Sequence, residues 1–189
     1  MRKLKLQVQM SVDGFVSTGP NDEQQWVTWA WEEIGPDVLA LADSADTILI
    51  GRKLAIDYIP YWESVYTNPE DAMYEVSKRV VNHKKVVFTK TLEKSEWNNT
   101  EIATGDLVEE VNKLKAQEGK DIIVYGGSSF AAALVQAGLI DEFYLFINPV
   151  ALGHGDSIFS SLSAFKQLQL KDTTVYNSGI VLMCYELKS

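Results

Sequence analysis

Every second residue is apolar over residues 3–10, at the start of the chain. Successive side chains of a strand point to opposite faces, so this period of two predicts a β-strand. Short apolar runs at 47–50, 85–89, 121–125 and 143–147 predict further strands. Continuous apolar runs of this length are typical of strands that are buried on both faces.

Apolar residues recur at helical spacing between these strands. The pattern predicts helices over 36–41, 68–83, 106–118 and 130–137. Pro36 lies in the first turn of the first helix, and Asn68 is the N-cap of the second. Between the strand at 47–50 and Asn68 lies a mixed segment rich in aromatic side chains (Tyr58, Tyr61, Trp62 and Tyr66), to which no element is assigned.

The last part of the chain has a different pattern. Apolar stretches at 168–170, 175–176 and 181–187 surround the turn Asn177-Ser178-Gly179 and predict antiparallel strands. Strands that alternate with helices and end in a hairpin predict a three-layer α/β/α fold, mostly parallel with antiparallel C-terminal strands. No internal repeat and no linker divides the 189 residues, so a single domain over 1–189 is expected.

Composition narrows the possible partners. The chain has 17 Lys and Arg against 26 Asp and Glu, and this net charge of −9 disfavours binding to nucleic acid. It has neither a signal-peptide pattern nor an apolar run long enough to span a membrane. The one cysteine, Cys184, excludes an internal disulfide, and His83 and His154 have no partners at metal-ligand spacing. A cytoplasmic protein without a metal site is expected.

A glycine turn joins a predicted strand directly to a predicted helix. Tyr125-Gly126-Gly127-Ser128-Ser129 leads into Phe130, where the helix is expected to begin. Glycines let a ligand approach the backbone, and the first turn of a helix offers unpaired N–H groups and a positive dipole to a phosphate. The segment therefore indicates an anion site, with a tight turn that binds nothing as the alternative.

Cationic residues follow two other predicted strands. Gly51-Arg52-Lys53 follows the strand at 47–50, and Thr89-Lys90 ends the strand at 85–89. Ligands bind at the carboxyl ends of strands in open α/β sheets, and Arg and Lys are good phosphate ligands. Each pair taken alone is also consistent with ordinary surface charge. Three such segments in an acidic chain together predict a site for a phosphorylated dinucleotide.

Five segments in this order resemble a known family: 11–16 (Ser-Val-Asp-Gly-Phe-Val), 45–52 (Ala-Asp-Thr-Ile-Leu-Ile-Gly-Arg), 125–127 (Tyr-Gly-Gly), 138–142 (Gly-Leu-Ile-Asp-Glu) and 149–155 (Pro-Val-Ala-Leu-Gly-His-Gly). The chain resembles the dihydrofolate reductase superfamily over about residues 3–187. The most similar branch contains the reductase (C-terminal) domain of the bifunctional riboflavin-biosynthesis deaminase-reductase.

The resemblance implies an NADPH-dependent reductase fold. It places the adenosine 2′-phosphate near Arg52, the pyrophosphate on the backbone that follows Gly126, and the nicotinamide against the first strand and Tyr125. The implied cofactor-binding residues are Val8, Gln9, Val16, Gly51, Arg52, Lys53, Thr89, Lys90, Tyr125, Gly126, Gly127, Ser128, Ser129 and Phe130.

Two acidic residues are the candidates for catalysis. Asp37 lies close to the place of the substrate carboxylate in dihydrofolate reductases, yet it also follows Pro36, where a helix N-terminus favours any acid. Asp13 either orients a substrate or caps the Asp13-Gly14 turn. Lys53-Leu54 replaces the family's usual Thr-Tyr, which removes one cofactor hydroxyl contact. One cysteine cannot form the zinc site of a deaminase, so only reductase activity is expected.

The expected function is an NADPH-dependent reductase of a small heterocyclic or carbonyl/imine substrate. It is similar to the 5-amino-6-(5-phosphoribosylamino)uracil reductase of riboflavin biosynthesis, although the net charge of −9 argues against a phosphoribosyl substrate. The alternatives are a dinucleotide-binding module of this fold without turnover, an interaction protein whose cleft is filled by side chains, and a dihydrofolate reductase proper.

The C-terminal strands carry apolar residues on both faces. Members of the branch that this chain resembles pair through their sheets, so a homodimer is expected with an interface in Phe143–Ile147 or Val181–Leu187. A central strand that is covered by the chain's own helices explains the same pattern without a partner.

Overall fold

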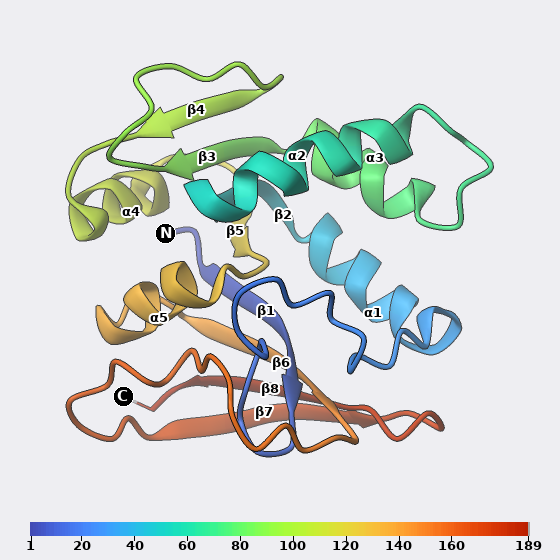
Figure 1. The fold of residues 1–189 in the computed structure, drawn as a ribbon. Coiled ribbons are helices and arrows are strands. Elements are labelled where there is room, and N and C mark those ends of the chain that lie inside the picture. The colour runs from blue at the N-terminus through green and yellow to red at the C-terminus, as the bar shows by residue number, and fades with distance from the viewer. Residues whose placement is uncertain (189) are drawn as a thin grey trace. The chain divides into compact units, whose positions relative to one another are not determined.

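The computed structural model describes residues 1–188, which divide into two compact units (Figure 1). Unit 1 contains residues 1–2 and 37–127, and unit 2 contains residues 3–36 and the chain from Ser128 onward. Each unit holds four of the eight strands. The expectation of a single domain over residues 1–189 stays a prediction.

The sheet of unit 1 is parallel and has the strand order β4-β3-β2-β5. Ile48, Leu49 and Ile50 of β2 are buried, and so is the apolar run of β5, as the sequence pattern predicts. Strand β4 was not predicted, because it has four residues of which only Ala103 is buried. The four strands are β2 (Ala45–Gly51), β3 (Lys84–Phe88), β4 (Thr100–Ala103) and β5 (Asp121–Val124).

Helix α2 (Arg52–Tyr66) lies against β2 and β3 (Figure 1). Ala55 and Ile59 lie one turn apart on it and pack against Ile50 and Val87 of the sheet. The sequence analysis assigned no element to this segment and was wrong there. Pro60 disfavours a helix in this segment because proline lacks the N–H that a helix interior uses. In the structure Pro60 is exposed, so the buried face of α2 stays intact.

Two more helices belong to unit 1. Helix α3 (Tyr74–Asn82) begins later than expected, because Asn68 accepts a hydrogen bond from the Glu70 N–H and forms a turn ahead of the helix. Helix α4 (Leu107–Ala116) follows the N-cap Asp106, whose carboxylate accepts from two backbone N–H groups of the first turn. The prediction of a helix over 106–118 is thus confirmed, apart from its last two residues.

Lys85 has a fully buried side chain beside the end of α3. Its Nζ donates to the carbonyl oxygens of Val80, Val81 and His83 at 3.0–3.1 Å. The last carbonyls of a helix have no partner within the helix, so the ammonium group supplies the hydrogen bonds that they lack. Burial lowers the pKa of Lys85 to about 8.

Unit 2 has the strand order β1-β6-β8-β7. Strand β1 is parallel to β6, whereas β6 and β8, and β7 and β8, are antiparallel. The strands are β1 (Leu4–Ser11), β6 (Glu142–Asn148), β7 (Leu168–Val175) and β8 (Val181–Leu187). The hairpin around residues 177–179 is confirmed, and so is the α/β class with mostly parallel strands and antiparallel C-terminal strands.

Helix α1 (Trp31–Asp43) starts five residues before Pro36, so the expectation of a helix with Pro36 in its first turn was wrong. Ile34, Val38 and Leu41 are buried at helical spacing, and this apolar stripe extends the helix across the proline. Helix α5 (Ser128–Gln136) starts two residues before the predicted Phe130. Within residues 1–188, no helix has the length and apolar character that crossing a membrane requires.

The lowered pKa of Lys85 predicts that the stability of the fold depends on pH. The folded value of about 8 is below the unfolded value of about 10.4, so the unfolded chain binds more protons between these two pH values. Stability therefore rises with pH across this window, by up to about 3 kcal/mol, and Lys85→Met removes the rise.

Urea unfolding near pH 7 and near pH 10 measures this difference. Lys84→Met is the matched control, because Lys84 is only half-buried and pairs with Glu101 at 2.9 Å. Equal pH dependence in the two variants would contradict the prediction.

Candidate functional site

The register of the parallel strands in unit 1 aligns three strand ends. Gly51, the last residue of β2, pairs with Phe88, the last residue of β3, and Leu49 pairs with Val124, the last residue of β5. The segments that follow these strands therefore leave the sheet at the same carboxyl edge, where ligands of open α/β sheets bind. The candidate residues Arg52, Thr89 and Tyr125 are the first residues after the three strands.

Arg52 and Lys53 form the first turn of α2, in the segment for which no element was predicted. The N-cap Gly51 has no side chain to accept the first N–H groups, and the first turn has no acidic residue. Arg52 is half-buried and Lys53 is exposed. Two cations, unpaired N–H groups and the positive end of the helix dipole thus favour an anion at this position.

Thr89 is buried and Lys90 is exposed at the end of β3. The hydroxyl oxygen of Thr89 accepts from the N–H groups of Thr91 and Leu92 at 3.1 and 3.2 Å. Thr89 therefore shapes the turn, which leaves the Lys90 ammonium as the exposed cation of this segment.

Tyr125 is held by aromatic packing at the end of β5. Its ring stacks on Tyr58 of α2 with centroids 6.2 Å apart, and Tyr58 meets Trp62 edge to face. Burial raises the pKa of Tyr125 far above its usual value, so the phenol stays protonated and remains a hydrogen-bond donor. Gly126 and Gly127 follow with φ of 125° and 78°, and a Cβ on Gly126 would meet no atom within 4 Å. The backbone at Gly126 is thus open to a close approach.

Ser128 begins α5 in unit 2, followed by the exposed Ser129 and the half-buried Phe130. The Ser128 hydroxyl donates to the carboxylate of Asp156 at 2.9 Å. The sequence analysis missed Asp156. Two glycines just before it, Gly153 and Gly155, could have indicated this residue, because they allow the chain to bring a carboxylate to a helix N-terminus.

The candidates on β1 face opposite sides of the sheet in unit 2. Val8 is buried, whereas Gln9 is half-buried and its Oε1 accepts from Asn148 Nδ2 at 2.9 Å. Asn148 is fully buried at the end of β6 and was missed, although a polar residue between an apolar run and Pro149 was a usable signal. Val16 lies in the loop after β1 and donates its N–H to the Asp156 carbonyl at 2.8 Å.

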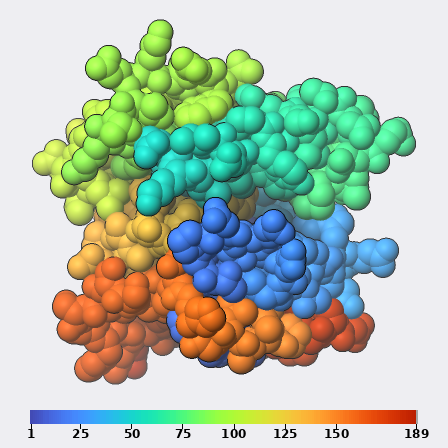
Figure 2. Space-filling view, in the orientation of Figure 1, coloured from blue at the N-terminus to red at the C-terminus, as the bar shows by residue number. Residues whose placement is uncertain are grey.

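Two loops of unit 2 are joined along their length: the loop of residues 11–17 and the loop of residues 150–156. The Asp13 carboxylate accepts from the N–H groups of Leu152 and Gly153 at 3.0 and 2.7 Å. Ser17 pairs with Asp156 in an antiparallel bridge, and a Cβ on Gly155 would collide with the Ser17 carbonyl. In Figure 2 the two segments, blue and orange, lie side by side on the same face.

Asp13 thus connects the two loops, a role beyond the local turn that the sequence suggested. Hydrogen bonds from Ser11 and from the Gly153 and Leu152 backbone lower the pKa of Asp13 to about 2. Asp13 is therefore ionised at neutral pH and is a poor proton donor.

Asp37 lies in the middle of α1, because that helix starts at Trp31. The argument that a helix N-terminus favours an acid at this position was therefore wrong. Its half-buried carboxylate keeps the role of substrate ligand as a prediction.

Other acids in the family-like segments hold the chain together. Asp46 binds Arg2 and the Lys120 N–H within unit 1. Asp141 accepts from the Leu4 N–H at 2.6 Å within unit 2. Among the described residues, no group of His, Cys, Asp and Glu is arranged to hold a metal ion.

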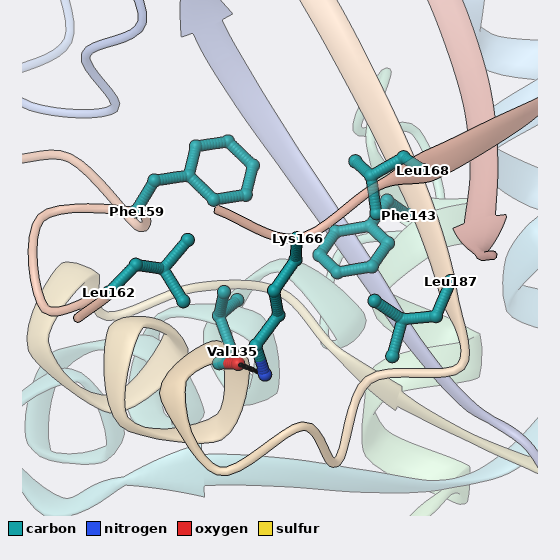
Figure 3. Close-up of a pocket in the computed structure, with 7 residues that line it drawn as sticks. All are labelled: Val135, Phe143, Phe159, Leu162, Lys166, Leu168 and Leu187. Atoms are coloured by element: carbon teal, nitrogen blue, oxygen red, sulfur yellow. Dashed lines mark hydrogen bonds between the residues drawn. The ribbon is translucent and has the colours of Figure 1, made fainter. Parts of the chain in front are cut away.

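A small cavity in unit 2 has a volume of about 30 Å³, room for about one water molecule (Figure 3). The Nζ of Lys166 donates to the Val135 and Gln136 carbonyls, so the one charged group at this cavity caps the end of α5. The cavity is therefore too small for a cofactor or a heterocyclic substrate. It is lined by Val135, Phe143, Phe159, Leu162, Lys166, Leu168 and Leu187.

Known proteins with the same fold include reductases. The structure of a dihydrofolate reductase from Enterococcus faecalis complexed with NADP(H) superposes with a TM-score of 0.60 at 13% identity, over 99% of this chain and 97% of that one. The deaminase/5-amino-6-(5-phosphoribosylamino)uracil reductase of Thermotoga maritima superposes with a TM-score of 0.70 at 17% identity, over 99% of this chain and 57% of that one. These likenesses establish a dihydrofolate reductase-like fold.

The family follows from the sequence match. Residues 2–182 match the model of the RibD C-terminal domain, and the chain belongs to that family. The chain is also 37% identical over 190 residues to the uncharacterized protein YyaP of Bacillus subtilis (strain 168), over 97% of this chain and 94% of YyaP. The resemblance inferred from five short segments is thereby confirmed.

The contacts of Asp13 predict that Asp13→Ala releases the loop of residues 150–156. The N–H groups of Leu152 and Gly153 lose their acceptor, and their hydrogen exchange is expected to accelerate about tenfold or more. Amide exchange measured by NMR checks this result. Asp172→Ala is the control, because among the described residues the Asp172 carboxylate accepts only from the adjacent Thr173 N–H. Unchanged exchange at both amides would refute the role of Asp13.

Proposed function

We propose that this protein is an NADPH-dependent reductase of a small heterocyclic or carbonyl/imine substrate, similar to the uracil reductase of riboflavin biosynthesis. The observation that supports it most is the common carboxyl edge of β2, β3 and β5 in unit 1. The proposal also includes a location in the cytoplasm.

The segments that follow β2, β3 and β5 fit the phosphate end of the cofactor. Arg52 and Lys53 bind the adenosine 2′-phosphate at the uncapped start of α2, with Lys90 as a third cation. Gly126, open to close approach, and the segment from Gly127 to Phe130 bind the pyrophosphate through the backbone. When bound, NADPH supplies the hydride, and the chain orients it.

The cationic start of α2 predicts a preference for NADPH over NADH. The 2′-phosphate is the only difference between the two, so Arg52→Ala is expected to weaken NADPH about tenfold or more and to leave NADH nearly unchanged. Fluorescence titration with both cofactors measures the ratio of dissociation constants. Lys78→Ala, an exposed cation on α3, is the control. Equal affinities for NADPH and NADH in the unmodified protein would overturn the assignment.

A binding module without turnover is the second candidate, and one observation favours it. The pKa of Asp13 is about 2 and both of its oxygens hold backbone N–H groups, so it supplies no proton to a substrate. Asp37 is then the remaining carboxylate candidate for the reaction. Whether the chain supplies a proton to the substrate therefore distinguishes a reductase from a binding module without turnover.

Turnover distinguishes these two functions. The reductase is expected to oxidise NADPH with at least one of dihydrofolate, the ribosylaminopyrimidine intermediate, small quinones and nitro compounds. Asp37→Asn is expected to lower kcat about tenfold or more without changing NADPH affinity. Absorbance at the NADPH band follows the reaction, with Asp172→Asn as the control. Tight NADPH binding with no turnover across the panel would favour the module.

The C-terminal hairpin supports the proposal of a homodimer. Val181, Met183 and Tyr185 of β8 share a face with Leu170 and Val175 of the edge strand β7. Leu170 is 51% exposed and Val175 is 74% exposed, so this apolar face is open on β7. Exposed apolar strips and sheet edges are common sites of association between chains.

Met183→Glu tests the dimer. Met183 is half-buried on the open face, so a carboxylate there is expected to break the dimer and leave the monomer folded. The molar mass measured by light scattering is expected to fall from twice 21.2 kDa for the unmodified protein to 21.2 kDa for the variant. Leu182→Glu would not be informative, because Leu182 is buried within the protomer. A mass of 21.2 kDa for the unmodified protein at micromolar concentration would exclude the dimer.

A further inference from the structure

The amide of Asn148 has one orientation, which its backbone partners determine. Its Oδ1 accepts from the Thr28 N–H at 2.8 Å, and its Nδ2 donates to the Phe146 carbonyl at 3.1 Å. A backbone N–H only donates and a carbonyl only accepts, so the oxygen and nitrogen of Asn148 cannot be exchanged. The side chain is fully buried, which makes a lost hydrogen bond costly.

This orientation is passed on to Gln9. The second hydrogen of Asn148 Nδ2 points to Gln9 at 2.9 Å, so Gln9 must turn its Oε1 toward Asn148. The Nε2 group of Gln9 is then directed away from Asn148. No described residue accepts a hydrogen bond from it, and Gln9 is half-buried. The strand therefore presents a hydrogen-bond donor of fixed direction.

Gln7 presents the opposite group on the same face of β1. Side chains two residues apart on a strand share a face, with Cα atoms about 6.7 Å apart. The Oε1 of Gln7 is buried and has no hydrogen-bond partner within the described part of the chain. An acceptor left in this state costs free energy until a donor reaches it. The two side chains thus offer one unpaired acceptor and one oriented donor on the same face of β1.

We propose that Gln9 and Gln7 together bind the carboxamide of the nicotinamide ring, and that Asn148 is the positioning residue that sets the polarity of the pair. Gln9 Nε2 donates to the carboxamide oxygen, and Gln7 Oε1 accepts from the carboxamide N–H. This assignment rests on the proposed function, because it requires a nicotinamide cofactor.

The chemistry of the pair selects a carboxamide. With Gln7 Oε1 directed to the ligand, a carboxylate would place a second acceptor against it, and a lone carbonyl would leave it unpaired. A carboxamide with a hydrogen bond on each side extends over at most about 8 Å, which the spacing of about 6.7 Å on the strand allows.

Two cofactor analogues separate the two contacts. The thionicotinamide analogue of NADP⁺ replaces the carboxamide oxygen with sulfur, a weak acceptor, and so loses the Gln9 contact. The 3-acetylpyridine analogue keeps the oxygen but has a methyl group in place of the amide nitrogen, and so loses the Gln7 contact. Isothermal titration calorimetry with the unmodified protein is expected to show each analogue binding about three- to tenfold more weakly than NADP⁺.

Matched variants assign each contact to its residue. Gln9→Met should abolish the discrimination against the thionicotinamide analogue and keep that against the acetylpyridine analogue, whereas Gln7→Met should do the reverse. Gln169→Met, an exposed glutamine on β7, should keep both. Asn148→Asp cannot donate to Gln9, so the Gln9 amide turns around and the discrimination against the thionicotinamide analogue disappears.

The outcomes separate this inference from the proposed function. Tight NADP⁺ binding with no discrimination between analogues, or with discrimination that Gln9→Met and Gln7→Met leave unchanged, overturns the inference alone. No NADP⁺ binding by the unmodified protein overturns both. If Asn148→Asp does not fold because its carboxylate faces the Phe146 carbonyl, the two glutamine variants still decide the question.

Discussion

The register of the parallel strands in unit 1 is the constraint on which the candidate site depends. The pairing of Gly51 with Phe88 and of Leu49 with Val124 brings three segments distant in sequence to one edge. A slip of one residue would turn every side chain of a strand to the other face. The register is protected because Ile48 and Ile123 are fully buried, so a slip would disrupt the close packing around them. Burial of the strand interiors therefore positions the polar residues at their ends.

Sequence patterns predicted the strands better than the helices. Strands with continuous apolar runs, such as Ile48-Leu49-Ile50, are recognisable because nothing polar interrupts these runs. Helices α1 and α2 were misread because each contains a proline that the sequence rules treat as a boundary. Tertiary packing keeps both helices intact across the proline. Ile34 ahead of Pro36 and Ile59 ahead of Pro60 are both buried, and that burial offsets the one backbone hydrogen bond that each proline removes.

The site itself was predictable in its cations and glycines but not in its acids. A glycine with positive φ such as Gly126 has a conformation that other residues avoid, so its position in the sequence is informative. A carboxylate looks the same in sequence whether it binds a substrate or a backbone N–H. Asp13 illustrates the problem, because its partners Leu152 and Gly153 are far away in the chain. The role of Asn148 was not predictable for the same reason, because it depends on hydrogen bonds to Thr28 and Gln9, which are far away in the sequence.

The division of the chain into units has a consequence for the order of synthesis. Unit 1 is almost continuous in sequence, whereas unit 2 is made of two pieces separated by residues 37–127. A chain that leaves the ribosome from its N-terminus has all of unit 1 before β1 can meet its partner β6. The pairing of Leu6 with Phe143 and of Val8 with Leu145 is therefore completed late in synthesis. The first strand of the protein thus gains its parallel neighbour β6 only after unit 1 has been made.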